Sequence, residues 1–292
     1  MIHNGFMSGD KSSSGTVKRA NRVRRDADNQ QETMYYFSGF FSGEGSISII
    51  RATNKNGGSG FYYTPDMTIS NADSVLLKRI NQTIFCNKGV MTPIKGGYNL
   101  SLRGKNKVII FLNFLKKYPP SAGDLIREKL ALIKKAVAIL LKKGNRNKRF
   151  SGEIESIEHI RQRLRIIKKT AQAEVNFSVM RSNRAQKGFF LSGVVDVEGS
   201  MGFRKCGKYM QPYFSVAMKD KAIIDLLYAF VGIGNIYYRP STKLFHFETG
   251  KRENVKYLCH MFLYEFPVQL SKNRKRLESI YRILNDYTRD PR

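Results

Sequence analysis

Apolar and polar residues recur along this chain with two periodicities, one typical of helices and one typical of strands. In the first half, the apolar residues of YYFSGFFSGEG (35–45) have helical spacing. Two alternating stretches that predict strands come next, then a helix, a hairpin and another helix. These segments are 47–52, 61–70, 74–85, 89–103 and 108–118, and a further amphipathic helix is predicted over 124–141.

The second half repeats this order. FFLSGVVDVEGSMGF (189–203) matches the first helix and turn of the first half. Two strands, a helix, a hairpin and two helices are then predicted, at 201–205, 211–218, 222–230, 234–250, 255–266 and 274–284. Because helices and hairpins are segregated, the pattern predicts an α+β fold of two pseudo-symmetric αββαββα repeats, each a four-stranded antiparallel sheet with helices on one face.

Two segments lie outside the repeats. Residues 1–32 contain few apolar residues, which predicts a disordered basic tail. Residues 143–185 are strongly basic, but apolar residues recur at helical spacing within 153–167, so we expect a basic linker that carries its own helix. The repeats themselves are placed at 33–142 and 186–292.

Charge is the strongest signal in the composition. Fifty-one Lys and Arg oppose 23 Asp and Glu, which gives a formal net charge of +28. This excess indicates nucleic acid as the partner, because Lys and Arg near phosphates release condensed counterions. A membrane partner is not expected, since no apolar run approaches the roughly 18 residues of a spanning helix. Cys86, Cys206 and Cys259 form no CxxC motif, which indicates a reducing compartment and argues against a structural zinc site.

The motif shared by the two halves places a glutamate at the end of a predicted apolar helix, Glu44 in the first half and Glu198 in the second. Gly39 and Gly43 lie one turn apart, and two glycines in one helix indicate a backbone that approaches another backbone closely. A carboxylate at a helix C-terminus opposes the helix macrodipole, so its presence in both halves needs a reason. If the two helices pack together, their carboxylates meet, and a divalent cation with oxygen ligands, Mg²⁺, relieves the repulsion.

Two carboxylates, bound Mg²⁺ and a basic surface are the parts needed to hydrolyse a phosphodiester. At these residues the sequence resembles a known family. FSGFFSGEG (37–45) and LSGVVDVEG (191–199) are similar to the two motif copies of single-chain LAGLIDADG homing endonucleases. The resemblance covers residues 33–142 and 186–288 and includes the order of helices and hairpins around each motif.

The resemblance implies an intron-encoded, monomeric endonuclease that cuts both strands of a double-stranded DNA target across the minor groove. It implies short 3′ overhangs and dependence on Mg²⁺, with Ca²⁺ or Mn²⁺ able to occupy the same sites. It also implies that the two motif helices join the repeats and that the two sheets form a saddle over the DNA. Two alternatives on the same fold stay open: a maturase that binds its own intron RNA, and a catalytically weak DNA-binding protein.

By this resemblance, Glu44 and Glu198 hold the last acidic position of each motif, the one that binds metal. Glutamate in place of aspartate keeps the ligand oxygens. The backbone carbonyls of Gly43 and Val197, just before the two acids, are also expected to face a metal. Val197 departs from the small residue of the first copy, so the second metal position is expected to differ from the first.

The family places a polar residue at the end of the second strand, where it holds the attacking water. That position is Asn71 in the first repeat and Met218 in the second, with Lys219 beside it as a candidate substitute. Methionine forms no useful hydrogen bond, so the second site is expected to be weaker and the strands to be cut at unequal rates. A basic residue usually follows the fourth strand, and the candidates are Lys105 or Lys107 in the first half and Lys251 or Arg252 in the second.

Sequence specificity is expected from strand residues that alternate toward the major groove. The candidates are Ser48, Ile50, Arg51, Arg103, Arg204, Gln211, Tyr213, Lys219, Arg239 and His246. A slip of one residue in register turns each of them to the opposite face, so periodicity alone does not fix their orientation.

Overall fold

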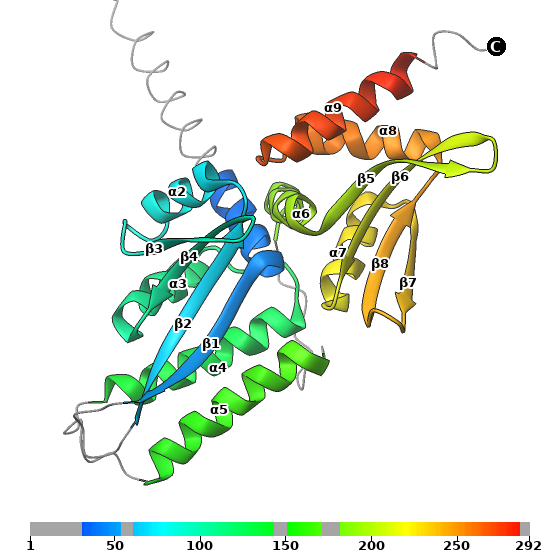
Figure 1. The fold of residues 1–292 in the computed structure, drawn as a ribbon. Helices are drawn as coiled ribbons and strands as arrows, with labels where there is room; N and C mark the ends of the chain where they lie inside the picture. The colour runs from blue at the N-terminus through cyan, green and yellow to red at the C-terminus, as the bar shows by residue number, and fades with distance from the viewer. Residues whose placement is uncertain (1–30, 54–60, 143–150, 171–181, 287–292) are drawn as a thin grey trace, which may run out of the picture.

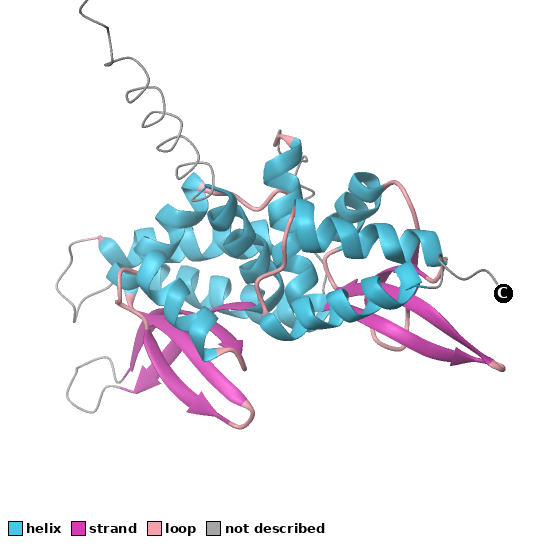
Figure 2. Cartoon of the chain, turned by 90° about the horizontal axis from the view of Figure 1, so that it is seen from above, coloured by secondary structure: helices cyan, strands magenta, loops and turns pink. Residues whose placement is uncertain are grey.

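The computed structural model describes residues 31–53, 61–142, 151–170 and 182–286. Two four-stranded antiparallel sheets lie side by side, and the helices form a layer on one side of both (Figures 1 and 2). The strand orders are β1-β2-β4-β3 and β5-β6-β8-β7, so the halves have the same topology. The predicted α+β fold of two αββαββα repeats is confirmed.

The first half begins with a helix over residues 31–44, which passes directly into the first strand. The elements that follow are β1 (Gly45–Thr53), β2 (Phe61–Asn71), α2 (Ser74–Thr83), β3 (Val90–Ile94), β4 (Gly97–Arg103), α3 (Lys105–Lys117) and α4 (Asp124–Leu141). Asp73 caps α2, since its carboxylate accepts from the backbone N–H of Leu76 at 3.0 Å. Each predicted segment of this half corresponds to one of these elements.

The second half begins with its motif helix, whose start is fixed by a capping box of Asn183 and Gln186. Its elements are α6 (Arg184–Glu198), β5 (Gly199–Cys206), β6 (Tyr209–Met218), α7 (Lys221–Val231), β7 (Asn235–Arg239), β8 (Leu244–Thr249), α8 (Arg252–His260), η1 (Met261–Glu265) and α9 (Ser271–Asp286). All the predicted strands and helices of this half are present.

One predicted helix differs in detail. The sequence predicts a single α-helix over 255–266, but α8 gives way to the π-helical turn η1, where the N–H of Phe266 donates to the carbonyl of Met261 at 2.8 Å. This wider turn buries three successive side chains, those of Met261, Phe262 and Leu263. Period-3.6 reasoning does not anticipate three consecutive buried residues, so the pattern alone did not reveal the turn.

Each half has its own apolar core between its sheet and its helices. The helix predicted inside the linker is α5 (Ser151–Thr170), and it packs against α4 and β1 (Figure 1). Ile157, Ile160 and Leu164 are buried in the core of the first half. In the described structure α5 is therefore a part of that core and does not stand free as a linker.

The remaining boundary predictions fall largely outside the described residues. This applies to most of the predicted tail (1–32), of which residues 31 and 32 are already helical, and to much of the predicted linker (143–185). Within the described part of the chain, no helix combines the length and the apolarity needed to cross a membrane.

Candidate active site

The two motif helices, residues 31–44 and α6, cross through their glycines. A Cβ added to Gly39 would lie 1.8 Å from the carbonyl oxygen of Phe190, and one added to Gly193 would lie 2.0 Å from that of Tyr36. Both contacts are with backbone, which cannot move aside as a side chain can. The expected close approach of one backbone to another is thus present, and it fixes how the halves are joined.

The crossing brings the glutamates of the two motifs together at the helix C-termini. A Cβ added to Gly43 would lie 3.0 Å from Val197 and 3.2 Å from Cγ of Glu198, so the last turns of the two helices are in contact. Burial, and to a smaller extent the nearby charge of Glu44, raise the pKa of Glu198 to about 7. Two carboxylates that influence each other in this way form a site that favours a cation.

The first glutamate has a hydrogen-bonding neighbour from the sheet. Burial raises the pKa of Glu44, and a hydrogen bond with the side chain of Asn71 opposes that rise. The Oδ1 atom of Asn71 accepts from the N–H of Asp73 at 2.9 Å, so its amide NH₂ is the group left to donate to the carboxylate. The structure therefore brings the predicted Asn71 to Glu44.

The second glutamate lacks such a partner at the corresponding strand end. Met218 ends β6 and is buried against the core of the second half. Lys219, the candidate substitute, turns toward the first half, where its Nζ donates to the carbonyl of Lys168 at the end of α5 at 2.9 Å. This placement does not support a role for Lys219 in holding water beside Glu198.

The predicted basic residues after the fourth strands lie at the wrong end of those strands. Asn71 pairs with Tyr98 at the start of β4, so Lys105 lies seven residues farther along, about 20 Å away. Its Nζ donates to the carbonyl of Leu140 at 2.8 Å. Lys251 likewise follows the far end of β8, because Met218 pairs with Phe245 at the start of that strand. A catalytic role for either lysine is not supported by these positions.

The site where Glu44 and Glu198 meet, at the C-termini of the two motif helices, offers oxygen donors that fit a divalent cation. Glu44 and Glu198 supply carboxylate oxygens, which hard cations prefer, and their mutual repulsion is relieved when a cation lies between them. Among the described residues, no three or more His, Cys, Asp and Glu side chains gather as a metal centre, so the two carboxylates are the acidic donors of this site. The carbonyls of Gly43 and Val197 adjoin the two acids in sequence, and their part in binding stays a prediction.

Two further carboxylates hold the halves together across the crossing. Asp196, two residues before Glu198, is buried and accepts from the hydroxyl of Tyr36 on the first motif helix at 2.7 Å. Within its own half it also accepts from the N–H groups of Gln269 and Leu270, just before α9. Asp220 accepts from three N–H groups at the start of α4, those of Asp124, Leu125 and Ile126. Each carboxylate thus satisfies the free N–H groups of a helix N-terminus, a role that the sequence did not reveal.

The outer faces of the two sheets, the faces away from the helices, carry most of the predicted DNA-contacting residues. Alternation in burial along the strands, with Ile47 and Ile49 turned to the core, fixes these faces. The predicted residues on the outer faces are Ser48, Ile50, Arg103, Arg204, Gln211, Tyr213, Arg239 and His246. Arg103 forms an ion pair with Asp66 at 3.2 Å on the same face.

Arg51 is an exception among these predictions. It pairs with Tyr63, whose hydroxyl donates to Glu158 of α5, so both residues face the helices. The guanidinium of Arg51 lies 3.9 Å from the centre of the Phe61 ring. Arg51 therefore belongs to the helix side of β1, one residue out of register with the outer face.

Two further residues lie on the outer face of the second sheet and were not predicted from the sequence, Glu248 and Tyr237. The hydroxyl of Tyr237 donates to Glu248 at 2.6 Å, and its ring stacks on that of His246 with centroids 5.0 Å apart. Burial, followed by the charge of Arg239, lowers the pKa of His246. Alternation along β8 was the available signal, because Glu248 lies two positions after the predicted His246 and shares its face.

Comparison with known proteins agrees with this geometry. Residues 37–140 match the family model described as LAGLIDADG endonuclease, whereas no curated protein matches the chain. The LAGLIDADG homing endonuclease I-GzeII in complex with its DNA target has a TM-score of 0.70 at 19% identity, over 88% of this chain and 91% of that one. The LAGLIDADG homing endonuclease I-LtrWI bound to target DNA has a TM-score of 0.71 at 16% sequence identity, over 89% of this chain and 91% of that one. I-SmaMI bound to its uncleaved DNA target in the presence of calcium ions has a TM-score of 0.66 at 16% sequence identity, over 88% of this chain and 99% of that one.

Proposed function

The chain belongs to the LAGLIDADG endonuclease family, and from that premise we propose that it is a site-specific DNA endonuclease acting as a monomer on a long double-stranded target. The observation that carries the proposal is the meeting of Glu44 and Glu198 where the motif helices cross. The net charge of +28 and the two outer sheet faces supply a surface suited to a polyanion. Relatives of the same fold are described in complex with DNA targets.

In the proposed mechanism the chain's own residues place the reacting groups. Glu44 and Glu198 would hold Mg²⁺ through their carboxylate oxygens, and the carbonyls of Gly43 and Val197 would be further ligands. Such a cation would supply Lewis-acid chemistry, activating a water for attack and stabilising charge on the leaving oxygen. Asn71 holds Glu44 in place and offers its amide to water on that side. Ca²⁺ or Mn²⁺ can occupy the same ligands.

The pseudo-twofold arrangement supports cleavage of both strands. Because the glutamates lie at one crossing between two sheets, we propose that each half acts on one strand where the minor groove passes the crossing. Cuts on opposite sides of a minor groove leave short 3′ overhangs. The pKa of Glu198, about 7 without a cation, makes its part in metal binding pH-dependent, because a ligating carboxylate must lose its proton.

The test is cleavage of DNA selected for binding from a random duplex library, with Mg²⁺ or with EDTA. We expect discrete Mg²⁺-dependent breaks with 3′ overhangs. Glu44→Gln and Glu198→Gln should each slow cleavage by about 100-fold or more, since a catalytic metal contributes several kcal/mol to the barrier. Glu278→Gln, which alters an exposed pair with Arg274 on α9, is the matched control.

The controls make the outcomes distinct. Both glutamine variants should keep their fold and their DNA binding, because glutamine removes a charge and keeps the shape of the side chain. Tight, salt-sensitive binding without Mg²⁺-dependent breaks would overturn the endonuclease. Such a result would leave a nucleic-acid-binding protein on this fold, and binding of the host intron RNA would then be measured.

A further inference from the structure

The outer face of the second sheet carries a carboxylate where a DNA-binding surface is expected to be basic. Glu248 of β8 lies on that face and its side chain is only 19% exposed. Facing phosphates, an unpaired carboxylate weakens binding, so its presence needs an explanation. The inference below deepens the proposed function and rests on it.

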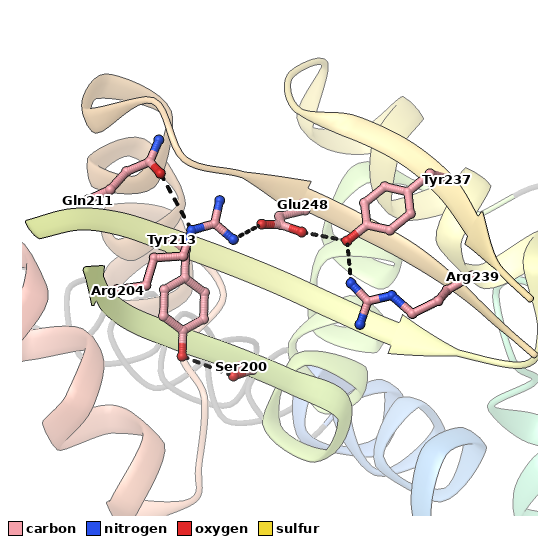
Figure 3. A network of polar contacts seen from close by, with 7 residues as sticks. All are labelled: Ser200, Arg204, Gln211, Tyr213, Tyr237, Arg239 and Glu248. Carbon is pink, nitrogen blue, oxygen red and sulfur yellow. Dashed lines mark hydrogen bonds and ion pairs between the residues drawn. The ribbon is translucent and has the colours of Figure 1, made fainter. Parts of the chain in front are cut away.

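Both oxygens of Glu248 are engaged (Figure 3). Nη1 of Arg204, from β5, donates to Oε1, and the hydroxyl of Tyr237, from β7, donates to Oε2 at 2.6 Å. Nη2 of Arg239 donates to the same Tyr237 hydroxyl at 3.5 Å. Glu248 thus links side chains from both edge strands of the sheet across the central ones.

The carboxylate stays ionised in this setting. Burial by itself raises the pKa of Glu248, but hydrogen bonds from Tyr237 and Arg204 and the charges of Arg204 and Arg239 lower it overall. An ionised carboxylate forms charge-assisted hydrogen bonds, which are stronger and more directional than neutral ones. Glu248 therefore holds the guanidinium of Arg204 firmly.

Arg204 remains able to contact a ligand. Its side chain is 50% exposed, and the bond to Glu248 together with a longer bond from Nε to Gln211 (3.5 Å) uses two of its five N–H donors. The other donors include a pair at the Nη end of the planar fork. Such a pair matches O6 and N7 of guanine in the major groove, whereas a mobile arginine binds any phosphate within reach.

We propose that Glu248 is a positioning residue for base recognition: it holds Arg204 so that this arginine reads one G·C pair of the target through the major groove. Tyr237 fixes the other oxygen of Glu248 and thereby its orientation. The carboxylate lowers non-specific attraction to DNA and raises discrimination at one base pair. Neither Glu248 nor Tyr237 needs to touch the DNA for this role.

The experiment measures binding, in Ca²⁺, to the selected target and to every single base-pair substitution of it, at fixed salt. Wild-type protein should prefer G·C at one position within the contact of the second half. Glu248→Gln should reduce that preference by about 5- to 100-fold, the range for a bidentate base contact, and leave the other positions unchanged. Arg204→Lys should lose the same preference, because an ammonium lacks the planar fork.

Matched measurements separate recognition from stability. Glu278→Gln, in an arginine–glutamate pair on the outer surface of α9, should keep the wild-type profile at every position. A Glu248→Gln profile identical to wild type overturns the proposal. So does a uniform loss of binding at all positions together with a lower melting temperature, since that pattern means a purely structural pair.

The readout also distinguishes this inference from the proposed function. The binding measurements test the role of Glu248 even if the protein binds its target without cutting it. Binding without cleavage would overturn the proposed nuclease activity alone. If the wild-type protein selects no DNA sequence at all, the inference falls with the site-specific function.

Discussion

The two halves place the same acid at the same point of the same fold and surround it differently. In the first half, Glu44 has Asn71 of β2 as a hydrogen-bonding neighbour. In the second half, the strand that corresponds to β2 ends in the buried Met218, and Glu198 has the higher pKa, about 7. The comparison teaches that the motif sets the position of the carboxylates, whereas the burial of each and the presence or absence of a hydrogen-bonding partner such as Asn71 set how easily each is ionised.

The two halves also differ in the residue at the sixth motif position and in how helix N-termini are capped. The sixth position of the second motif is Asp196, which caps α9, while the sixth position of the first motif is Ser42, whose hydroxyl donates to Ser38 of its own helix. The cap of α4 comes instead from Asp220 on the second half. Both helix N-termini are therefore capped from the second half, so the pseudo-symmetry of the fold is not a symmetry of its hydrogen bonds.

The largest expected effect comes from the part that the halves share, the glycine crossing. Gly193→Ala should destabilise the protein by about 3 kcal/mol or more, because its Cβ meets the backbone of Tyr36 and Phe40 at 2.0 and 2.5 Å. Gly43→Ala should cost less than about 1 kcal/mol, since its contacts at 3.0–3.2 Å are with the side chains of Val197 and Glu198, and a shift of a few tenths of an ångström relieves them. Urea unfolding measures both.

A helical glycine in the open is the control for these variants. A Cβ added to Gly152 of α5 meets nothing within 4 Å, so Gly152→Ala should be neutral or stabilising by up to about 1 kcal/mol. If Gly193→Ala is no worse than Gly152→Ala, the two helices do not pack backbone to backbone and the joining of the halves is wrong.

The pH dependence of stability, an effect of at most similar size, separates the two glutamates. The pKa of Glu198 in the folded, metal-free protein is about 7 against an ordinary value of 4.5, so the folded state holds a proton that the unfolded chain has lost. Stability is then greatest below pH 4.5 as far as this group is concerned, and it falls as pH rises to about 7. The full difference corresponds to roughly 3 kcal/mol.

Urea unfolding in EDTA at several pH values between 4.5 and 8 checks this prediction. Glu198→Gln should be increasingly more stable than wild type as pH rises through that range. Glu44→Gln should show the same sign with a smaller change, because Asn71 opposes the rise in the pKa of Glu44. A constant difference between wild type and Glu198→Gln across the range contradicts the buried, coupled pair.

Sequence patterning predicted the order of elements because apolar periodicity reports which face of each element is buried. Asn71 came from the family resemblance, which places a polar residue at the end of the second strand, and its role in holding water stays a prediction. The resemblance also placed Lys105 and Lys251 at the site, because "after the fourth strand" is a sequence position, but the antiparallel strand carries the chain away from the glutamates. Arg51 fell on the wrong face through a slip of one residue.

Other features depend on contacts between distant segments, which periodicity does not report. The attachment of α5 to the first core follows from its apolar stripe meeting α4 and β1. The capping of α4 by Asp220 joins residues about a hundred positions apart. Glu248 was overlooked because a carboxylate on a basic surface makes sense only once Arg204 and Tyr237 are seen beside it.

The central claim is that Glu44 and Glu198 occupy equivalent positions but have different neighbours. Its most direct test is to measure cleavage of each DNA strand separately. Each strand of the selected target carries its own 5′ label, and both cuts are timed after Mg²⁺ is added to the preformed complex. We predict that one strand is cut faster and that a nicked duplex accumulates. Asn71→Met, which makes the two corners alike, should slow the faster cut and bring the two rates together. Equal rates in the wild-type protein, unchanged by Asn71→Met, would contradict the account.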